Sequence, residues 1–308
     1  MDIRAGEPAL RRDLLRAGVT DDEMRRAVRN GLWHPVRPGA YLRADDPVLA
    51  DPDQRHVQLV LATVLRLDGT PIVSHLSAAA MYELPLWGVP LRTVHVTREA
   101  SSGGRRTRHL HVHPAPIAPD EVLTIGGLQV TSPARTVVDI ARTVRFESAV
   151  VIADAALKAE LCTRDELDAA VVRAGRRSGG PASRRVVAFA DGLSDGPGES
   201  RSRVRMQLAC LPRPVLQHVV RDRNGRRVGQ VDFWWPHAGV IGEYDGEIKY
   251  GRLLRPGQDA STVVYREKLR EDALRAQPGV RTVVRWTWRD VEEFDELASR
   301  LRELLGRA

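Results

Sequence analysis

The sequence predicts an α+β protein with several domains, and three observations support this class. The chain has 308 residues, a length that suggests two or three domains rather than one. Apolar residues at helical spacing alternate along the chain with short runs at strand spacing. A stretch rich in Gly, Ser and Pro, residues 190–200, interrupts these patterns and marks a boundary. We therefore expect domains at residues 1–45, 46–180 and 195–308, of which the middle one is α+β.

The charge of the chain favours an anionic partner. The net charge is +7 at neutral pH, and the sequence pI is near 10.0. Nearly all of the basic residues are arginines, whose planar guanidinium pairs with phosphate through two hydrogen bonds. This composition favours nucleic acid as the partner. A GC-rich genome, which enriches arginine everywhere, is the alternative explanation.

The cysteines and the apolar runs indicate a cytoplasmic protein. Cys162 and Cys210 are too few and too far apart for a disulfide framework or a zinc site. The N-terminal residues lack the apolar core of a signal peptide. No apolar run approaches the length of a membrane span, so we expect no membrane partner.

Residues 1–45 follow the order helix, turn, helix and hairpin. Leucines at helical spacing occupy residues 9–17. Thr20 and Glu23 have the spacing of a capping box, in which each side chain bonds the backbone N–H of the other at the start of a helix. The Pro-Gly pair at 38–39 predicts a turn between two short strands. This order is typical of a winged helix-turn-helix domain.

Four arginines of this region are candidates for DNA contact. In such a domain the second helix of the pair enters the DNA groove, and we expect the hairpin to touch the flanking backbone. We therefore assign Arg25, Arg26 and Arg29 of the second helix, and Arg37 of the hairpin, to DNA binding. The alternative is a small helical domain whose arginine face is solvated or docks another protein.

The middle region mixes helices and strands. Residues 91–99 and 110–116 alternate apolar and polar side chains and are predicted as strands joined by a Gly-rich turn. A helix is predicted to begin at Ser132-Pro133, with Ser as its N-cap and Pro at its first position. Arg135 and Asp139 stand four residues apart on that helix, and we expect them to form a structural ion pair.

Four histidines are scattered over the middle region, at positions 75, 95, 111 and 113. His111 and His113 share one face of a predicted strand and have the chemistry to bind a metal ion. Surface histidines are the simpler interpretation, because no further ligand has zinc-site spacing.

The first two regions resemble a known family. Residues 9–43, which include RRDLLRAGV and RNGLWHPVRPGAYLR, resemble the N-terminal winged helix of AbiEi-type antitoxins from type IV toxin–antitoxin systems. SHLSAAAMYELPL and TSPARTVVDIAR are similar to the middle region of the same family. The resemblance implies DNA binding and regulation of the protein's own promoter rather than catalysis, with a toxin as a protein partner.

The last region resembles a different family. GPGES, VDFWWP, the acidic EYDG and REKLREDALRAQPGVRTVVRWTWRDV occur in the order found in the nuclease-like domain related to very-short-patch repair endonucleases. That domain belongs to the PD-(D/E)XK superfamily. The resemblance covers residues 195–308 and implies an α/β restriction-endonuclease-like fold.

The acidic residues of this region suit phosphodiester hydrolysis. The reaction needs a cation that neutralises phosphate and activates water, and Mg2+ prefers carboxylate oxygens. Asp232 and Glu243 lie on two predicted antiparallel strands, and alternation puts Glu243 and Asp245 on one face. We assign Asp232 and Glu243 as ligands of Mg2+ or Mn2+. Glu199, at the start of the preceding helix, and Asp245 support them. A strand pair with a solvated acidic face is the alternative.

The lysine of the superfamily is displaced. It usually follows the second acid by two residues, and that position holds Asp245. Lys249, four residues later, is a candidate to orient the attacking water or the phosphate, or only to contact phosphate. Eight arginines against a single acid between residues 201 and 230 provide the basic surround expected of a site that handles DNA. The nearby tryptophans are expected to pack in the core rather than to stack on bases.

Three hypotheses follow from these patterns. The first is a DNA-binding protein of antitoxin type that carries a metal-dependent nuclease domain. The second is a non-enzymatic regulator whose degenerate nuclease fold only grips nucleic acid. The third is an interaction protein that neutralises a toxin by direct contact.

Overall fold

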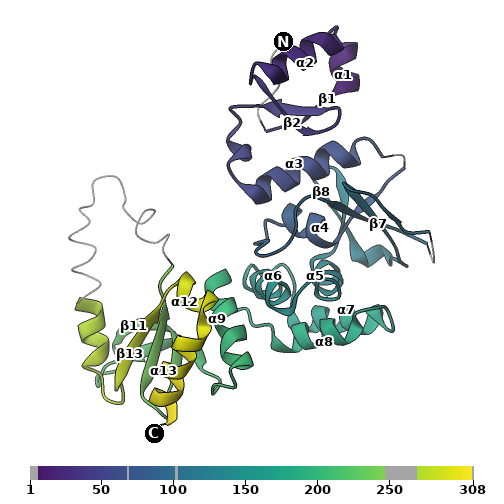
Figure 1. The fold of residues 1–308 in the computed structure, drawn as a ribbon. Helices are drawn as coiled ribbons and strands as arrows, with labels where there is room; N and C mark the ends of the chain where they lie inside the picture. Colours follow the sequence, from purple (N-terminus) through teal and green to yellow (C-terminus); the bar gives the residue numbers. More distant parts are fainter. Residues whose placement is uncertain (1–5, 68, 101–102, 247–268, 307–308) are drawn as a thin grey trace. The chain divides into compact units, whose positions relative to one another are not determined.

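The computed structural model describes residues 6–67, 69–100, 103–246 and 269–306 (Figure 1). Internal contacts divide the chain into two compact units, residues 1–189 and 190–308. Each unit combines helices with sheets, which confirms the α+β multidomain class. The separation of residues 1–45 from 46–180 inside the first unit stays a prediction. Within the described ranges, no helix is long and apolar enough to cross a membrane.

The first unit opens with the predicted order of two helices and a hairpin. Its elements are β1 (Ala9–Leu10), α1 (Arg11–Arg16), α2 (Asp21–Arg29), β2 (Trp33–Arg37) and β3 (Ala40–Arg43), and the antiparallel sheet has the order β1-β3-β2. Both hydrogen bonds of the predicted capping box join Thr20 and Glu23 at the start of α2. Gly39 has φ 77° in the hairpin turn, a conformation that glycine adopts without steric cost. α2 anchors this part by burying Met24.

A six-stranded mixed sheet follows, in the order β6-β7-β5-β4-β9-β8. Its strands are β4 (Ile72–Val73), β5 (Val94–Arg98), β6 (Arg105–Arg106), β7 (Leu110–Pro114), β8 (Val122–Ile125) and β9 (Leu128–Thr131). Apolar side chains of α3 (Pro52–Val64) and α4 (His75–Met81) form one core cluster with residues of β4, β5 and β9. The core of this unit therefore joins the helices to the middle of the sheet.

The link between the two predicted strands of this region needs a correction. β5 and β7 are neighbours, but they run parallel, with His95 opposite His111 and Thr97 opposite His113. A turn alone cannot join parallel strands, because the chain must return to the starting edge. The returning segment contains β6, which pairs antiparallel with β7.

The remaining helices of the first unit are α5 (Pro133–Ala141), α6 (Phe146–Lys158), α7 (Arg164–Ala174) and α8 (Gly180–Phe189), and short 3-10 turns lie at Pro47–Leu49 and Pro119–Glu121. The predicted ion pair on α5 is confirmed, with Arg135 Nε 2.6 Å from Asp139 Oδ2. The pair is buried and belongs to a network: Arg135 also bonds Glu121, and Arg142 bonds Asp139.

The second unit is built on the four-stranded sheet β10-β11-β12-β13. Its elements are α9 (Pro197–Leu208), β10 (Val215–Arg221), β11 (Arg227–Trp235), β12 (Val240–Tyr244), β13 (Thr282–Trp286), α12 (Trp288–Glu292) and α13 (Phe294–Gly306), with a further helix at 269–275. β11 and β12 pair antiparallel, as predicted, and β12 and β13 pair parallel. Figure 1 shows α9, α12 and α13 beside this sheet.

Apolar side chains of this sheet form two separate clusters. The α13-side cluster joins Phe233, Trp235 and Trp286 to residues of α9, α12 and α13. The 269–275-side cluster joins Val231 and Ile241 to Leu274 and others. Trp235 and Trp286 are almost completely buried, which confirms the core interpretation for these two tryptophans.

Candidate functional site

Glu199 is held at the start of α9, where the helix approaches β12 closely. A Cβ atom at position 198 would lie 2.1 Å from Cζ of Tyr244, so the glycine at this position lets the first turn touch the tyrosine ring. Asp195 donates its backbone N–H to Glu199 Oε2 at 2.9 Å. The Glu199 side chain is therefore held near the end of β12, and only 7% of the residue is exposed.

Asp232 lies where the alternation of β11 shifts. Residues two apart on a strand share a face, yet Val231 packs in the 269–275-side cluster and Phe233 in the α13-side cluster. Asp232 stands between them, and its Oδ2 accepts the backbone N–H of Tyr244 at 2.8 Å. The Asp232 carboxylate therefore bonds the backbone of β12 just beyond Phe233, where the regular pairing of β11 with β12 ends.

Gln217 joins the two carboxyl groups. Its Nε2 lies 2.9 Å from Glu199 Oε2 and 3.5 Å from Asp232 Oδ1. Gln230 donates to Gln217 Oε1 at 2.8 Å and fixes the orientation of the amide. Gln217 has φ 48°, an uncommon conformation for a residue other than glycine. Sequence reasoning missed this residue, because glutamine on a strand carries no signal of its own.

The electrostatics of this pair favour a protonated Glu199. Burial raises the pKa of Glu199 to about 7, and the neighbouring charge of Asp232 adds to the effect. A carboxyl group with such a pKa exchanges its proton near neutral pH, and a bound cation would favour its ionised form. Glu199 and Asp232 come from different elements, and the fold brings both to the amide of Gln217.

Glu243 has other partners. Its two oxygens accept from Arg270 Nη2 at 2.9 Å and from Arg285 Nε at 3.0 Å. Arg285 also lies 3.4 Å from Glu271, on the described helix at 269–275. These arginines neutralise the Glu243 carboxylate, so a cation there would have to replace them. The assignment of Asp232 and Glu243 as a pair of metal ligands stays a prediction.

Of the other two predicted members of the site, Asp245 lies within the described residues and Lys249 does not. Asp245 continues the contact between β12 and β13 by donating its backbone N–H to Trp286 O at 2.8 Å. Lys249 lies outside the described residues, and its role stays a prediction. Sequence reasoning missed Arg270 and Arg285 as partners of Glu243, because they lie 27 and 42 residues after it in the sequence.

The basic surround of this site needs a correction. Arg201 is 1% exposed, stacks on the ring of Trp288 with 4.4 Å to the centroid, and lies 3.9 Å from Glu292. Arg203 is also buried, with Nη2 4.0 Å from Asp191. These two arginines hold the fold together, because their guanidinium groups face protein partners. Part of the positive charge counted near the acids is therefore structural.

The arginines of α2 face solvent. Arg25, Arg26 and Arg29 are exposed, on the side of the helix opposite the buried Met24. Arg25 pairs with Asp22 on the same helix, whereas Arg26 and Arg29 form no ion pair with any residue in the described ranges. The charge of these two side chains is therefore presented to solvent, where an anionic partner can reach it.

Arg37 is placed differently from the other three arginines. It is partly buried, and its Nη1 donates to Thr63 Oγ1 of α3 at 2.6 Å. Burial lowers the pKa of Arg37, and the charge of Arg66 contributes in the same direction. The guanidinium joins the hairpin to α3, a contact better suited to holding the fold than to touching phosphate.

The comparisons with known proteins support part of the family resemblance. Residues 87–185 match the sequence model of the AbiEi antitoxin C-terminal domain. Two uncharacterized proteins of Mycobacterium tuberculosis, from strains H37Rv and CDC 1551, are 36% identical to this chain over 121 residues, which is 39% of the chain. The chain spans 44% of the length of these relatives. A crystal structure of the RV2827C protein from the same organism aligns with TM-score 0.39 and 15% identity over 70% of this chain and 83% of that one.

Proposed function

We propose that this protein is a DNA-binding regulator of the AbiEi antitoxin type, which binds the promoter of its own gene and has a toxin as its partner. The observation that carries the proposal is the solvent-facing arginine pair of α2, Arg26 and Arg29, in a domain with helix, helix and hairpin order. The match of residues 87–185 to an antitoxin family supports the same function. A cytoplasmic location fits this function and stays a prediction.

The test compares two charge-matched double variants in binding to a DNA duplex from upstream of the protein's own reading frame. Arg26→Ala with Arg29→Ala removes two proposed phosphate contacts. The slope of log K against log salt is then expected to fall by about 1.8, since each contact contributes about 0.9. Arg12→Ala with Arg16→Ala is the control, because both arginines lie beside Asp13 on α1. If the salt slope of the Arg26 and Arg29 double variant were no smaller than that of the control variant, a protein-docking surface would be favoured.

We propose as a second candidate function that the second unit is a nuclease domain that hydrolyses phosphodiester bonds. The specific observation is the carboxyl pair of Glu199 and Asp232, joined by Gln217. Carboxylate oxygens are ligands that Mg2+ and Mn2+ accept, so this pair fits such an ion. A bound cation would neutralise the phosphate and activate water. Glu199 and Asp232 would hold it, and Glu243 would join only on release from its arginines.

The nuclease proposal is tested by incubating plasmid, single-stranded DNA and RNA with the protein and Mg2+ or Mn2+. Cleavage is expected for the parent protein and is expected to be lost in Asp232→Asn and in Glu199→Gln. Asp222→Asn is the control, because Asp222 caps the turn between β10 and β11 through backbone N–H groups. Cleavage that survives Asp232→Asn would remove this pair from the reaction. Absence of cleavage on every substrate would contradict the nuclease proposal and leave only the DNA-binding regulator proposal.

A further inference from the structure

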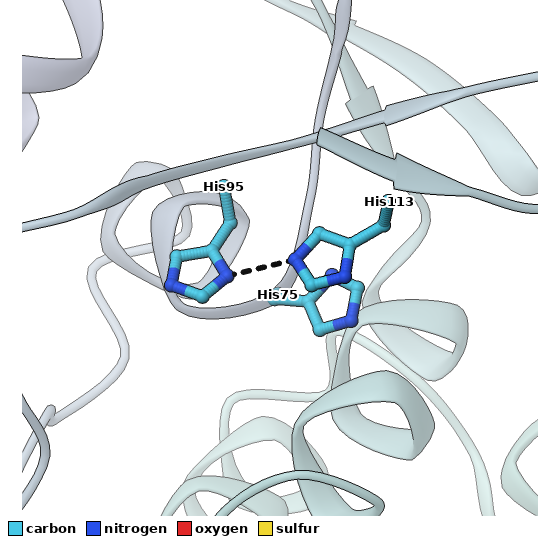
Figure 2. Close-up of side chains that lie close together, drawn as sticks. All are labelled: His75, His95 and His113. Carbon is cyan, nitrogen blue, oxygen red and sulfur yellow. Dashed lines mark hydrogen bonds between the residues drawn. The ribbon is translucent and has the colours of Figure 1, made fainter. Parts of the chain in front are cut away.

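Three histidines from separate elements of the first unit lie close together (Figure 2). His75 is the first residue of α4, His95 lies on β5 and His113 on β7. One nitrogen of each lies within 4.8 Å of those of the other two. In the parallel pairing of β5 and β7, His95 stands opposite His111 and Thr97 stands opposite His113. His95 and His113 are therefore diagonal neighbours on one face of the sheet. A site built from three chain segments is more than a local sequence pattern.

The two strand histidines have nitrogens at a spacing close to that of two ligands of one small cation. His95 Nδ1 lies 3.0 Å from His113 Nε2. Two nitrogens that each lie 2.0–2.1 Å from a tetrahedral zinc ion are about 3.3 Å apart. The ring of His75 stacks on that of His113 with 3.8 Å between centroids. The nitrogens of the three rings lie within 4.8 Å of one another, so the His75 ring would have to turn and approach the other two to surround an ion.

The surroundings fix the rings. His75 Nδ1 lies 3.0 Å from Ser74 Oγ, which leaves Nε2 of that ring for an ion. A hydrogen bond at the second ring nitrogen is the usual support of a metal-binding histidine. The backbone N–H of His95 donates to Ser77 Oγ at 2.8 Å and ties β5 to α4. His75 has φ 50°, an uncommon backbone conformation that turns the first residue of α4.

The rings are also in the form that binds metal. Burial lowers the pKa of His95 to about 3 and that of His113 to about 2, and it holds the pKa of His75 well below its ordinary value. Neutral imidazole is the form in which histidine binds a metal ion. Nearby positive charge on Arg135 and Arg142 opposes a cation, whereas the carboxylate of Asp139 acts in the opposite sense.

We propose that His75, His95 and His113 bind a zinc ion, with water or a small anion as the fourth ligand. Imidazole nitrogens suit zinc, and three protein ligands with one open position are a common zinc arrangement. The ion would join the start of α4 to two strands of the six-stranded sheet. This site is independent of the acidic pair on the second unit and of the arginines of α2.

The experiment measures zinc binding by the full chain after removal of bound metal with a chelator. One zinc ion per chain is expected, and Co2+ is expected to give the visible absorption of a tetrahedral site. His95→Gln and His113→Gln are each expected to weaken zinc binding at least tenfold. His111→Gln is the matched control: the centroid of this ring lies 3.7 Å from that of His113, but His111 lies outside the group of three. Binding in that variant is expected to remain close to the parent value.

Two further measurements keep the proposal open to refutation if a histidine variant folds poorly. Zinc is expected to raise the unfolding temperature of the parent and of Asp232→Asn, which lacks the acidic pair, but not that of His113→Gln. Mg2+ is expected to have no such effect on the first unit. Failure of the parent to bind zinc, or equal binding by the parent and both histidine variants, would overturn the site. Neither result would bear on DNA binding by α2 or on cleavage.

Discussion

Glu199 and Asp232 have one donor in common, because Gln217 Nε2 lies 2.9 Å from the Glu199 carboxyl group and 3.5 Å from that of Asp232. One amide nitrogen therefore faces two acids, one of them buried. The free energy of unfolding is therefore expected to depend on pH, since the pKa of Glu199 is raised from 4.5 to about 7.

The first prediction concerns the stability of the second unit against pH. A carboxyl group whose pKa is higher in the folded state binds its proton more tightly there. Its contribution to the free energy of unfolding is therefore full below pH 4.5 and falls until about pH 7. The loss should amount to about 3–4 kcal/mol at about 1.4 kcal/mol per pKa unit. Urea unfolding from pH 4.5 to 8 measures it. Glu199→Gln is expected to flatten this dependence, whereas the exposed Glu293→Gln should not, and equal curves would contradict the assignment.

The second prediction concerns the close approach of β12 and β13. A Cβ at position 242 would lie 2.5 Å from the ring of Trp286, which is buried. We expect Gly242→Ala to destabilise the second unit by about 1–3 kcal/mol, the usual range for overpacking. Gly229→Ala on the same sheet is the control, because its Cβ would meet neighbours only at 3.5 Å. Thermal unfolding of both variants checks the difference, and equal unfolding temperatures would refute the prediction.

The third prediction concerns the buried ion network of α5. Arg135→Met removes the partner of Glu121 and leaves Asp139 with Arg142 alone. Loss of one partner of a buried pair costs about 3–5 kcal/mol. Arg173→Met breaks a pair with Asp120 whose side chains are about half exposed, and such pairs contribute at most about 1 kcal/mol. Denaturant unfolding of the two variants should differ accordingly; a similar loss in both would contradict the buried role.

The fourth prediction separates Arg37 from the arginines of α2. Arg37→Met removes the hydrogen bond to Thr63 and should lower the free energy of unfolding by about 1 kcal/mol. DNA affinity measured at fixed salt should change less than twofold, while Arg26→Ala with Arg29→Ala weakens it clearly. If the Met variant lost affinity as strongly as that double variant, Arg37 would be a phosphate contact after all.

Short-range patterns were predictable from the sequence. The capping box of Thr20 and Glu23 and the pair of Arg135 and Asp139 depend on spacing within one helix, and both are present. The antiparallel strands β11 and β12 follow from the alternation and from the turn between them. These features form from neighbours three to ten residues apart, so the spacing of residue types along the chain is enough to specify them.

The assembly of the sites depended on the tertiary structure. Alternation alone would put Val231 and Phe233 on one face of β11 and Asp232 on the other. Instead the alternation shifts at this point, and the Asp232 carboxyl group lies near Gln217. The parallel direction of β5 and β7 decides that His95 and His113 meet, and His75 joins them from a helix. Sequence spacing fixes which face of an element a side chain occupies, whereas packing and strand direction fix which faces of different elements come together.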